Sequence, residues 1–224
     1  MDTVMTPRVA ATLDRRALAT LSEGASIAIK REVHELVVSA PAPAFAAAFR
    51  AVMMAPESRF GDIRVRRPEG RLGATFEIGE RFQGAFDVCS ALARRGPAGR
   101  LAAAILARTP ALARRLEDAF LSDYAEIEVI EALPGGGERL RYRYLEGTPI
   151  AGSSTFLVTP DGDARCRVTQ IFEYQEVNAF ALAAFQHAGL KLHDHVVWEQ
   201  VRKAAAQAGG QVISATIPRG YVAA

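Results

Sequence analysis

The sequence predicts a single α+β domain in which an antiparallel sheet is combined with a long C-terminal helix. Two observations carry this expectation. Residues 124–177 contain four strand-like stretches separated by turn sequences, whereas residues 179–208 have the periodicity of one continuous helix. With 224 residues, 50% of them hydrophobic, the chain is long enough to bury a substantial core. Because the sequence shows no internal repeat and no linker, we expect residues 1–224 to form one domain.

The composition excludes several classes of protein. The 27 basic and 25 acidic residues leave a net charge of +2, so we expect no nucleic-acid partner. No stretch approaches about 18 consecutive apolar residues, and the charged N-terminus does not resemble a signal peptide. Two cysteines are too few for a disulfide framework, which favours a cytoplasmic location. Because nucleotide-binding motifs and zinc-ligand spacings are absent, we expect neither a cofactor nor a metal.

The first elements are expected to be a helix and then a strand. Residues 7–23 have helical spacing and end at Gly24, so residues 1–25 are interpreted as an N-terminal helical extension. Residues 26–38 have extended character. One phase of their alternation is apolar, and it comprises Ile27, Ile29, Val33 and Val37.

A short helix and a hairpin are expected next. Prolines at positions 41 and 43 end the strand and suit the start of a helix over residues 44–53. This helix is expected to bury Phe45, Phe49 and Val52. Strands over residues 63–67 and 74–86 then flank a turn at residues 68–70, and Gly79 and Gly84 mark bends of a curved sheet.

Residues 88–122 are interpreted as a helical insertion that is divided at Pro110. No acidic residue lies between Asp87 and Glu117, and the segment has a leucine-rich apolar side. A basic amphipathic segment is typical of a lid over a cavity or of a contact with an anionic membrane, and it also fits an ordinary solvated excursion. The six arginines of this segment are Arg94, Arg95, Arg100, Arg108, Arg114 and Arg115.

The remaining chain predicts an antiparallel meander followed by the long helix. Strands are expected over residues 124–132, 138–145, 152–159 and 164–177. Asn178 is expected to begin the helix and Gly209 to end it. A last extended segment covers residues 211–217.

This order of elements resembles the helix-grip fold of the START-like, or SRPBCC, superfamily. The matching landmarks are Val-Ser-Ala-Pro-Ala-Pro-Ala-Phe at 38–45, the hairpin at 68–76, and the strand at 167–174 that leads into the long helix. The resemblance covers residues 26–208, and the N-terminal helix and the insertion depart from it. It implies a curved sheet around a deep, mainly apolar cavity. Members bind lipids, sterols, polyketides and plant hormones, and some catalyse cyclisation, dehydration or hydrolysis.

Strand alternation and helix phase predict which side chains face this cavity. The tyrosines of strand 138–145 alternate with arginines, which puts the tyrosines inside. On the long helix, the stripe Leu182, Phe185, Gly189, Leu192 and Val196 is expected to face the sheet, and Leu190, Val197, Trp198 and Val201 to lie on the far side against the N-terminal helix or another subunit. The expected ligand-binding residues are Phe76, Tyr142, Tyr144, Gln170, Phe172, Tyr174, Phe185, Gly189 and His193.

Two functions remain open at the level of the sequence. The first is a non-catalytic carrier or sensor that binds a hydrophobic small molecule, such as a lipid, sterol or polyketide. The alternative is an enzyme of the polyketide cyclase or dehydratase type, for which Tyr142, His193 and Glu80 are the candidate catalytic residues. A regulatory domain with a filled cavity is a third interpretation. His187, His193 and His195 point in different directions around the helix, so they do not form a shared metal site.

Overall fold

The computed structural model describes residues 29–55, 58–61, 63–66, 76–93, 96–113, 122–145, 150–176 and 189–219. The described strands form one antiparallel nine-stranded sheet, in the order β2-β3-β4-β5-β6-β7-β8-β1-β9. The predicted N-terminal helix and residues 179–188 of the long helix, including Phe185, lie outside the described residues. The strands are β1 (Lys30–Val38), β2 (Arg59–Phe60), β3 (Ile63–Arg66), β4 (Arg81–Phe86), β5 (Ser122–Leu133), β6 (Gly137–Tyr144), β7 (Ile150–Pro160), β8 (Cys166–Glu176) and β9 (Val212–Thr216).

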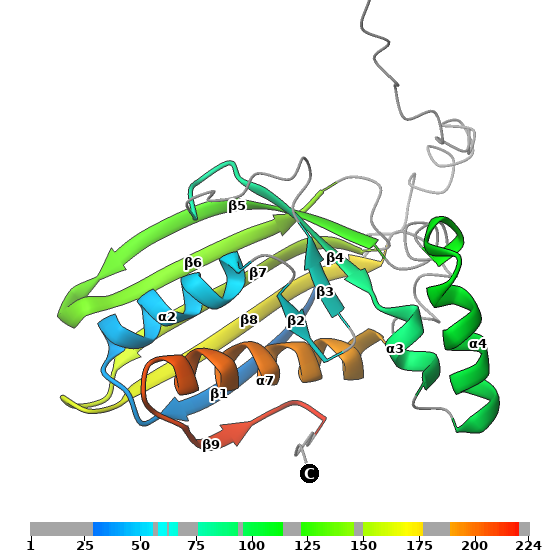
Figure 1. The fold of residues 1–224 in the computed structure, drawn as a ribbon. Coiled ribbons are helices and arrows are strands. Elements are labelled where there is room, and N and C mark those ends of the chain that lie inside the picture. Colours follow the sequence, from blue (N-terminus) through cyan, green and yellow to red (C-terminus); the bar gives the residue numbers. More distant parts are fainter. Residues whose placement is uncertain are drawn as a thin grey trace, which may run out of the picture.

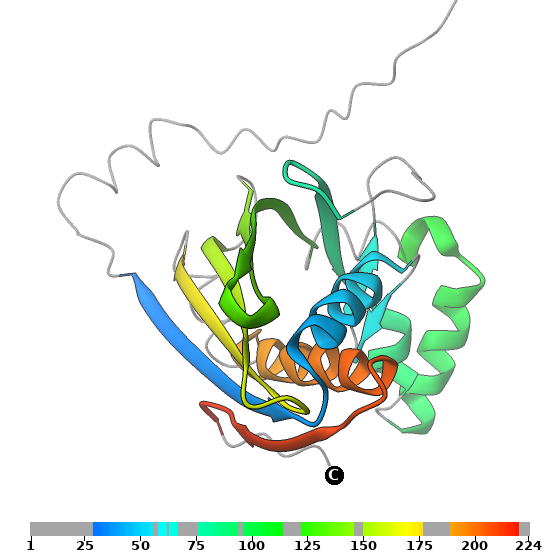
Figure 2. The same ribbon diagram turned by 90° about the vertical axis from the view of Figure 1, so that its left-hand side faces the viewer.

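The sheet curves around the C-terminal helix α7 (Leu190–Gln207), and α2 (Ala42–Met54) packs beside this helix on the same face. Figure 1 and Figure 2 show both helices on the concave side of the sheet, with α3 (Val88–Ala93) and α4 (Pro97–Ala107) beyond its β2–β4 end. This arrangement is the predicted helix-grip fold. Among the described residues, no helix combines the length and the apolar character needed to cross a membrane.

The predicted meander and its alternation are confirmed. Strands β5 to β8 pair in sequence order, and a tight turn at Pro134–Gly136 joins β5 to β6. Tyr142 on β6 and the predicted inner phase of β8 are buried, while the β6 arginines form ion pairs with glutamates of β5 on the outer face. The buried residues of β8 are Cys166, Val168, Gln170, Phe172 and Tyr174.

The side chains of strand β1 that face the core belong to its more polar phase. The apolar phase, which includes Val33, faces away from the core. His34 and Leu36 are fully buried, whereas Val33 is 38% exposed and Ile29, just before the strand, is 71% exposed. The reason is that β1 carries Glu32 and His34 on its inner phase, where both find charged partners. Paired polar residues are tolerated inside, so an apolar pattern alone did not fix the facing of this strand.

The buried side of helix α7 is wider than predicted and includes residues that the sequence placed on the far side. Leu190, Val197 and Val201 are buried, although the sequence placed them on the far side. Leu192 and Val196 of the predicted stripe are partly buried. Two polar residues, Asp194 and Gln200, are also buried on this helix, so its buried side does not look apolar in the sequence. The predicted end of this helix is confirmed, since Gly209 has a φ of 78° and the Gly210 amide donates to the Ala205 carbonyl.

Two further elements differ from the sequence prediction. The strand expected over residues 74–86 begins only at Arg81, because Ile78 and Gly79 form a turn in which Gly79 has a φ of 87°. Glu80 therefore does not continue a strand alternation that starts at Phe76. In the insertion, Gly96 and Pro97 separate α3 from α4, and this break was not predicted from the sequence. Gly96 has a φ of 87°, and Pro97 takes the first position of α4.

Gly152 on β7 has no room for a side chain. A Cβ built at this position would lie 2.0 Å from the Glu173 carbonyl oxygen on the neighbouring strand β8. We therefore expect Gly152→Ala to lower the free energy of unfolding by about 3 kcal/mol, because backbone atoms must move to accept the methyl group. Gly162→Ala is the matched control: its φ is also positive, at 82°, but no atom lies within 4 Å.

Chemical denaturation of both variants measures the effect of the crowding. The control is expected to cost about 1 kcal/mol, which is the penalty for a left-handed backbone conformation. Equal losses in the two variants would show that backbone conformation, and not the close approach of β8, governs position 152.

Candidate functional site

A layer of buried polar side chains crosses the space between the sheet and α7. Four of its members have no exposed surface, namely His34, Ser154, Gln170 and Asp194. His34 Nε2 lies 2.7 Å from Asp194 Oδ1, so a buried imidazole on β1 is hydrogen-bonded to a buried carboxylate on α7. Strand β1 and the helix are thus joined by a polar contact inside an otherwise apolar interior.

Arg219, which follows the last strand, completes this contact. Its guanidinium donates to both oxygens of Asp194, at 2.6 and 2.7 Å, and to both oxygens of Glu32, at 2.6 and 2.7 Å. It also donates to the Leu190 carbonyl at 3.2 Å. Planar, two-pronged pairing of this kind is specific to arginine, and it ties β1, α7 and the C-terminal segment together.

These contacts set the charge of the layer. Burial raises the pKa of Asp194, but hydrogen bonds from His34 and Arg219 outweigh it, so the pKa of Asp194 is lowered overall. The pKa of Arg219 is raised by its hydrogen bonds to Glu32, against the effect of burial, and Asp194 raises it further. The carboxylate and the guanidinium are therefore both charged at neutral pH and compensate each other.

His193 adjoins the layer but is kept neutral. Burial is the largest influence and lowers the pKa of His193 to about 3; the charges of His34 and Arg219 act in the same direction and Asp194 opposes them. The ring stacks on Phe172 with centroids 4.1 Å apart. Its Nε2 lies 3.5 Å from Gln170 Nε2, which also donates to Ser154 Oγ at 2.7 Å. A neutral imidazole with one donor and one acceptor nitrogen is well suited to hydrogen bonding.

A continuous group of aromatic rings extends from this layer across the inner face of the sheet. Tyr142 contacts Phe82 and Tyr144 at centroid distances of 5.2 and 5.9 Å. Tyr144 reaches Phe172 at 5.9 Å, across β7, and Phe172 stacks on Tyr174 at 4.6 Å. Strand β7 contributes Gly152 and Ser154 between these rings, and such small residues let the side chains of β6 and β8 meet over it.

Part of this inner surface remains accessible. Phe82 and Tyr144 on the sheet, and His193 and Val196 on α7, are partly exposed, although all four belong to or pack against the interior. The neighbouring side chains deeper in the interior are buried, namely those of Ala125, Ile127, Tyr142 and Phe172. The inner surfaces of β4, β6 and α7 thus keep solvent-accessible area at these four side chains. This partly open surface is the candidate ligand site.

The polar layer also contains three groups of the type that bind metals. His34, His193 and Asp194 each offer an atom, and these atoms lie within 4.8 Å of one another. Arg219, however, already donates to both oxygens of Asp194, and its positive charge lies next to any cation placed there. The residues therefore fit a hydrogen-bonded ion network better than a divalent metal.

The structure brings together most of the residues that the sequence singled out. Tyr142, Tyr144, Gln170, Phe172, Tyr174 and His193 form one connected cluster. Phe76 is partly buried against the core, and Gly189 immediately precedes α7. Glu80 lies in the segment before β4, where its carbonyl accepts from the Ile127 amide. Phe185 lies outside the described residues.

Sequence reasoning missed the charged part of the site. His34, Asp194, Glu32 and Arg219 come from three distant parts of the chain, and none stands in a recognisable motif. One signal was present: His34 and Asp194 each stand close to apolar residues that share their face of β1 or α7. A polar residue on a buried stripe needs a partner, and two such residues on facing elements are candidates to be that pair.

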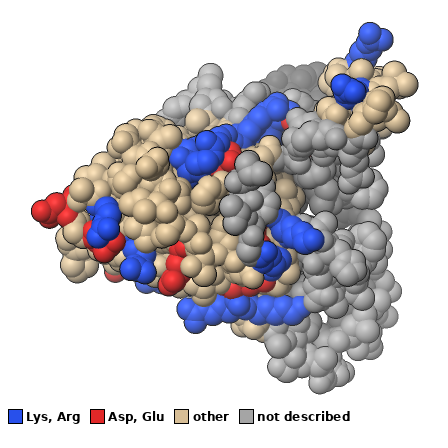
Figure 3. Space-filling model, turned by 90° about the horizontal axis from the view of Figure 1, so that it is seen from below, with Lys and Arg blue, Asp and Glu red and all other residues tan. Residues whose placement is uncertain are grey.

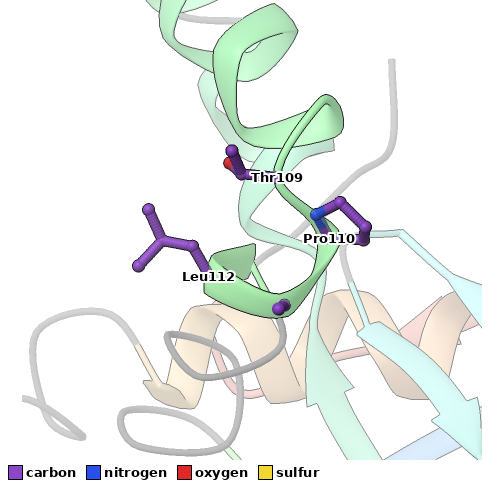
Figure 4. Close-up of a pocket in the computed structure, with 4 residues that line it drawn as sticks. Thr109, Pro110 and Leu112 are labelled. Carbon is purple, nitrogen blue, oxygen red and sulfur yellow. The ribbon is translucent and has the colours of Figure 1, made fainter.

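An open depression of about 480 Å³ lies outside this region, against Thr109, Pro110, Ala111 and Leu112. Figure 4 shows that these residues form one short turn after α4, with Leu112 and Pro110 directed to different sides. Among the described residues, the lining comes from four consecutive positions, so polar groups of different described elements do not converge there. It lacks the features of an enclosed small-molecule site.

No known family model matches the sequence, and no curated protein matches it. Solved structures of similar fold include truncated norcoclaurine synthase from Thalictrum flavum, with 13% identity, coverage of 80% of this chain and 94% of that one, and a TM-score of 0.48. They also include the Zhui aromatase/cyclase from Streptomyces sp. R1128, with 12% identity, coverage of 81% of this chain and 94% of that one, and a TM-score of 0.48. A major latex-like protein from Panax ginseng has 12% identity, coverage of 80% of this chain and 96% of that one, and a TM-score of 0.42. At these identities and TM-scores, the likenesses concern the overall fold and assign no function.

Proposed function

We propose that this protein binds an apolar small molecule between the inner face of β4–β6 and helix α7. One observation carries the proposal: Phe82, Tyr144, His193 and Val196 face the interior but stay partly exposed, while the side chains behind them are buried. An apolar surface of this kind with a few polar atoms at one end is typical of a small-molecule site.

The polar layer supplies the end of the site that recognises polar groups. Within the described part of the chain, His193 Nδ1 and Gln170 Oε1 are buried without a hydrogen-bond partner. An unsatisfied buried polar atom is costly, so a ligand with a hydroxyl or carbonyl group at this end is favoured over a pure hydrocarbon. A planar, aromatic or fused-ring ligand suits a surface that is itself aromatic.

A carrier or sensor is favoured over the cyclase or dehydratase alternative. An efficient general base has a pKa near the working pH, whereas the pKa of His193 is about 3. His34 is fully buried, and its Nε2 is committed to Asp194. The histidines of the site are thus arranged for hydrogen bonding and charge balance, and neither combines an accessible nitrogen with a suitable pKa.

A blocking substitution on α7 tests the location of the site. Val196 is partly buried on the inner side of the helix, and Lys191 is exposed on the same helix. With 1-anilinonaphthalene-8-sulfonate as the fluorescent probe, we expect Val196→Trp to weaken binding about tenfold or more, which corresponds to about 1.4 kcal/mol. Lys191→Trp, the matched control, is expected to bind the probe as the wild type does.

Two results would count against the proposal. Unchanged probe affinity in Val196→Trp, in a variant that still unfolds cooperatively, would place the bound probe elsewhere. Equal losses in both tryptophan variants would indicate that binding does not depend on the inner side of α7. Native mass spectrometry of the purified wild type then identifies the natural ligand by the mass that it adds.

A further inference from the structure

Helix α4 is packed in the reverse of the usual way. It buries small residues, Gly99 and Ala103, whereas its large residues Leu101 and Ile105 are 65% and 56% exposed. A surface helix normally turns its large apolar side chains toward the core. Among the described elements, the main contacts of α4 are with α3. The large side chains of α4 are therefore available for a contact outside the described fold.

The exposed residues form one continuous stripe. Leu101, Ile105 and Arg108 are spaced by four and then three residues, so they share one face of the helix. Arg100, next to Leu101, and Arg108 are both exposed. Leu112, in the turn drawn in Figure 4, is 49% exposed and is a further exposed apolar side chain close by in the sequence.

The charge of this surface has one sign. The sequence contains no acidic residue from position 88 to position 116, and six arginines lie in this interval. On the face drawn in Figure 3, basic side chains lie close to acidic ones in several places. Exposed leucine and isoleucine in a segment whose charged residues are all arginines are typical of a helix that lies in the interface of an anionic membrane.

We propose that the stripe of Leu101, Ile105 and Arg108, with the neighbouring Arg100 and the exposed Leu112 of the following turn, docks onto an anionic lipid surface. The apolar side chains enter the boundary between headgroups and acyl chains, and the guanidinium groups bind the lipid phosphates. Charge complementarity selects this occupant over a neutral membrane, whose zwitterionic headgroups carry no net negative charge to attract the arginines. The inference is independent of the proposed ligand site, because no residue of the stripe contributes to that site.

Co-sedimentation of the full chain with vesicles tests the proposal. We expect binding to vesicles that contain phosphatidylglycerol in phosphatidylcholine, little binding to phosphatidylcholine alone, and weaker binding as salt increases. Arg100→Gln and Arg108→Gln are each expected to lower the partition coefficient about fivefold, and Leu101→Ser about tenfold. All three positions are exposed, so we expect each variant to keep the thermal stability of the wild type.

Matched controls lie away from α4. Arg167→Gln on β8 and Ile213→Ser on β9 replace an exposed arginine and an exposed isoleucine, and both are expected to bind vesicles like the wild type. Absence of binding to the anionic vesicles, or equal losses in the controls, would overturn the proposal. So would a stable dimer, detected by light scattering, that Leu101→Ser dissociates, because a second copy would then cover the stripe. We expect all of these variants to bind the fluorescent probe at the inner side of α7 as the wild type does, so this test and the test of the ligand site can fail separately.

Discussion

Replacing Arg219 by alanine is expected to lower the free energy of unfolding by about 3–5 kcal/mol. The substitution leaves two carboxylates, Asp194 and Glu32, without their shared cation. Asp194 has no exposed surface in the wild type, and the loss of Arg219 removes two of the hydrogen bonds that compensate its buried charge. Urea denaturation at pH 7 measures the effect. Arg219→Lys is expected to lie between the wild type and the alanine variant, because lysine keeps the charge but cannot pair with two oxygens of each acid.

Arg202→Ala is the matched control. Arg202 also donates twice to one carboxylate, that of Glu199, but its side chain is 49% exposed. An exposed pair of this kind is worth at most about 1 kcal/mol. A loss of less than about 1 kcal/mol in Arg219→Ala, similar to that of the control, would show that the buried network does not hold the C-terminal segment, α7 and β1 together.

Replacing His193 by phenylalanine is expected to make the protein less sensitive to mild acid. In the unfolded chain a histidine binds a proton below a pH of about 6.5, whereas the pKa of His193 in the folded state is about 3. Between these values the unfolded state binds the additional proton, so the stability of the wild type falls as the pH falls. Phenylalanine does not titrate, and its ring has the shape to keep the stacking on Phe172.

The linkage gives the size of this effect. The stability of the His193→Phe variant relative to the wild type is expected to rise by about 2 kcal/mol between pH 7 and pH 5. Urea denaturation of both proteins at several pH values measures this difference, and the effects of the other titrating groups largely cancel in it. A difference that stays constant from pH 7 to pH 5 would contradict a buried, neutral imidazole at this position.

The parts of the fold that the sequence predicted correctly depend on unambiguous alternation. On β6, tyrosines and arginines alternate, and only one facing puts the aromatic rings inside and the charges in water. On β8, the more apolar phase is likewise the buried one. The described strands begin and end close to the predicted positions, so the meander and the long helix after it followed from local patterns.

The parts that could not be predicted depend on partners distant in the chain. His34 and Asp194 are 160 positions apart, and each makes the buried face of its own element look polar. Alternation alone therefore did not determine which phase of β1 faces inward, and it placed the buried Leu190, Val197 and Val201 of α7 on the far side of that helix. The aromatic part of the candidate site was predictable from strand phase, but the charged part was not, because its members are compatible only in three dimensions.

The most direct test of the proposed ligand site is an NMR measurement of contacts between the bound probe and individual side chains. With 1-anilinonaphthalene-8-sulfonate bound to the wild type, we expect intermolecular nuclear Overhauser effects to the rings of Phe82 and Tyr144 and to the methyl groups of Val196, the partly exposed residues of the inner surface. Contacts confined to the exposed Leu101 and Ile105 of α4, with none to these three residues, would contradict the account.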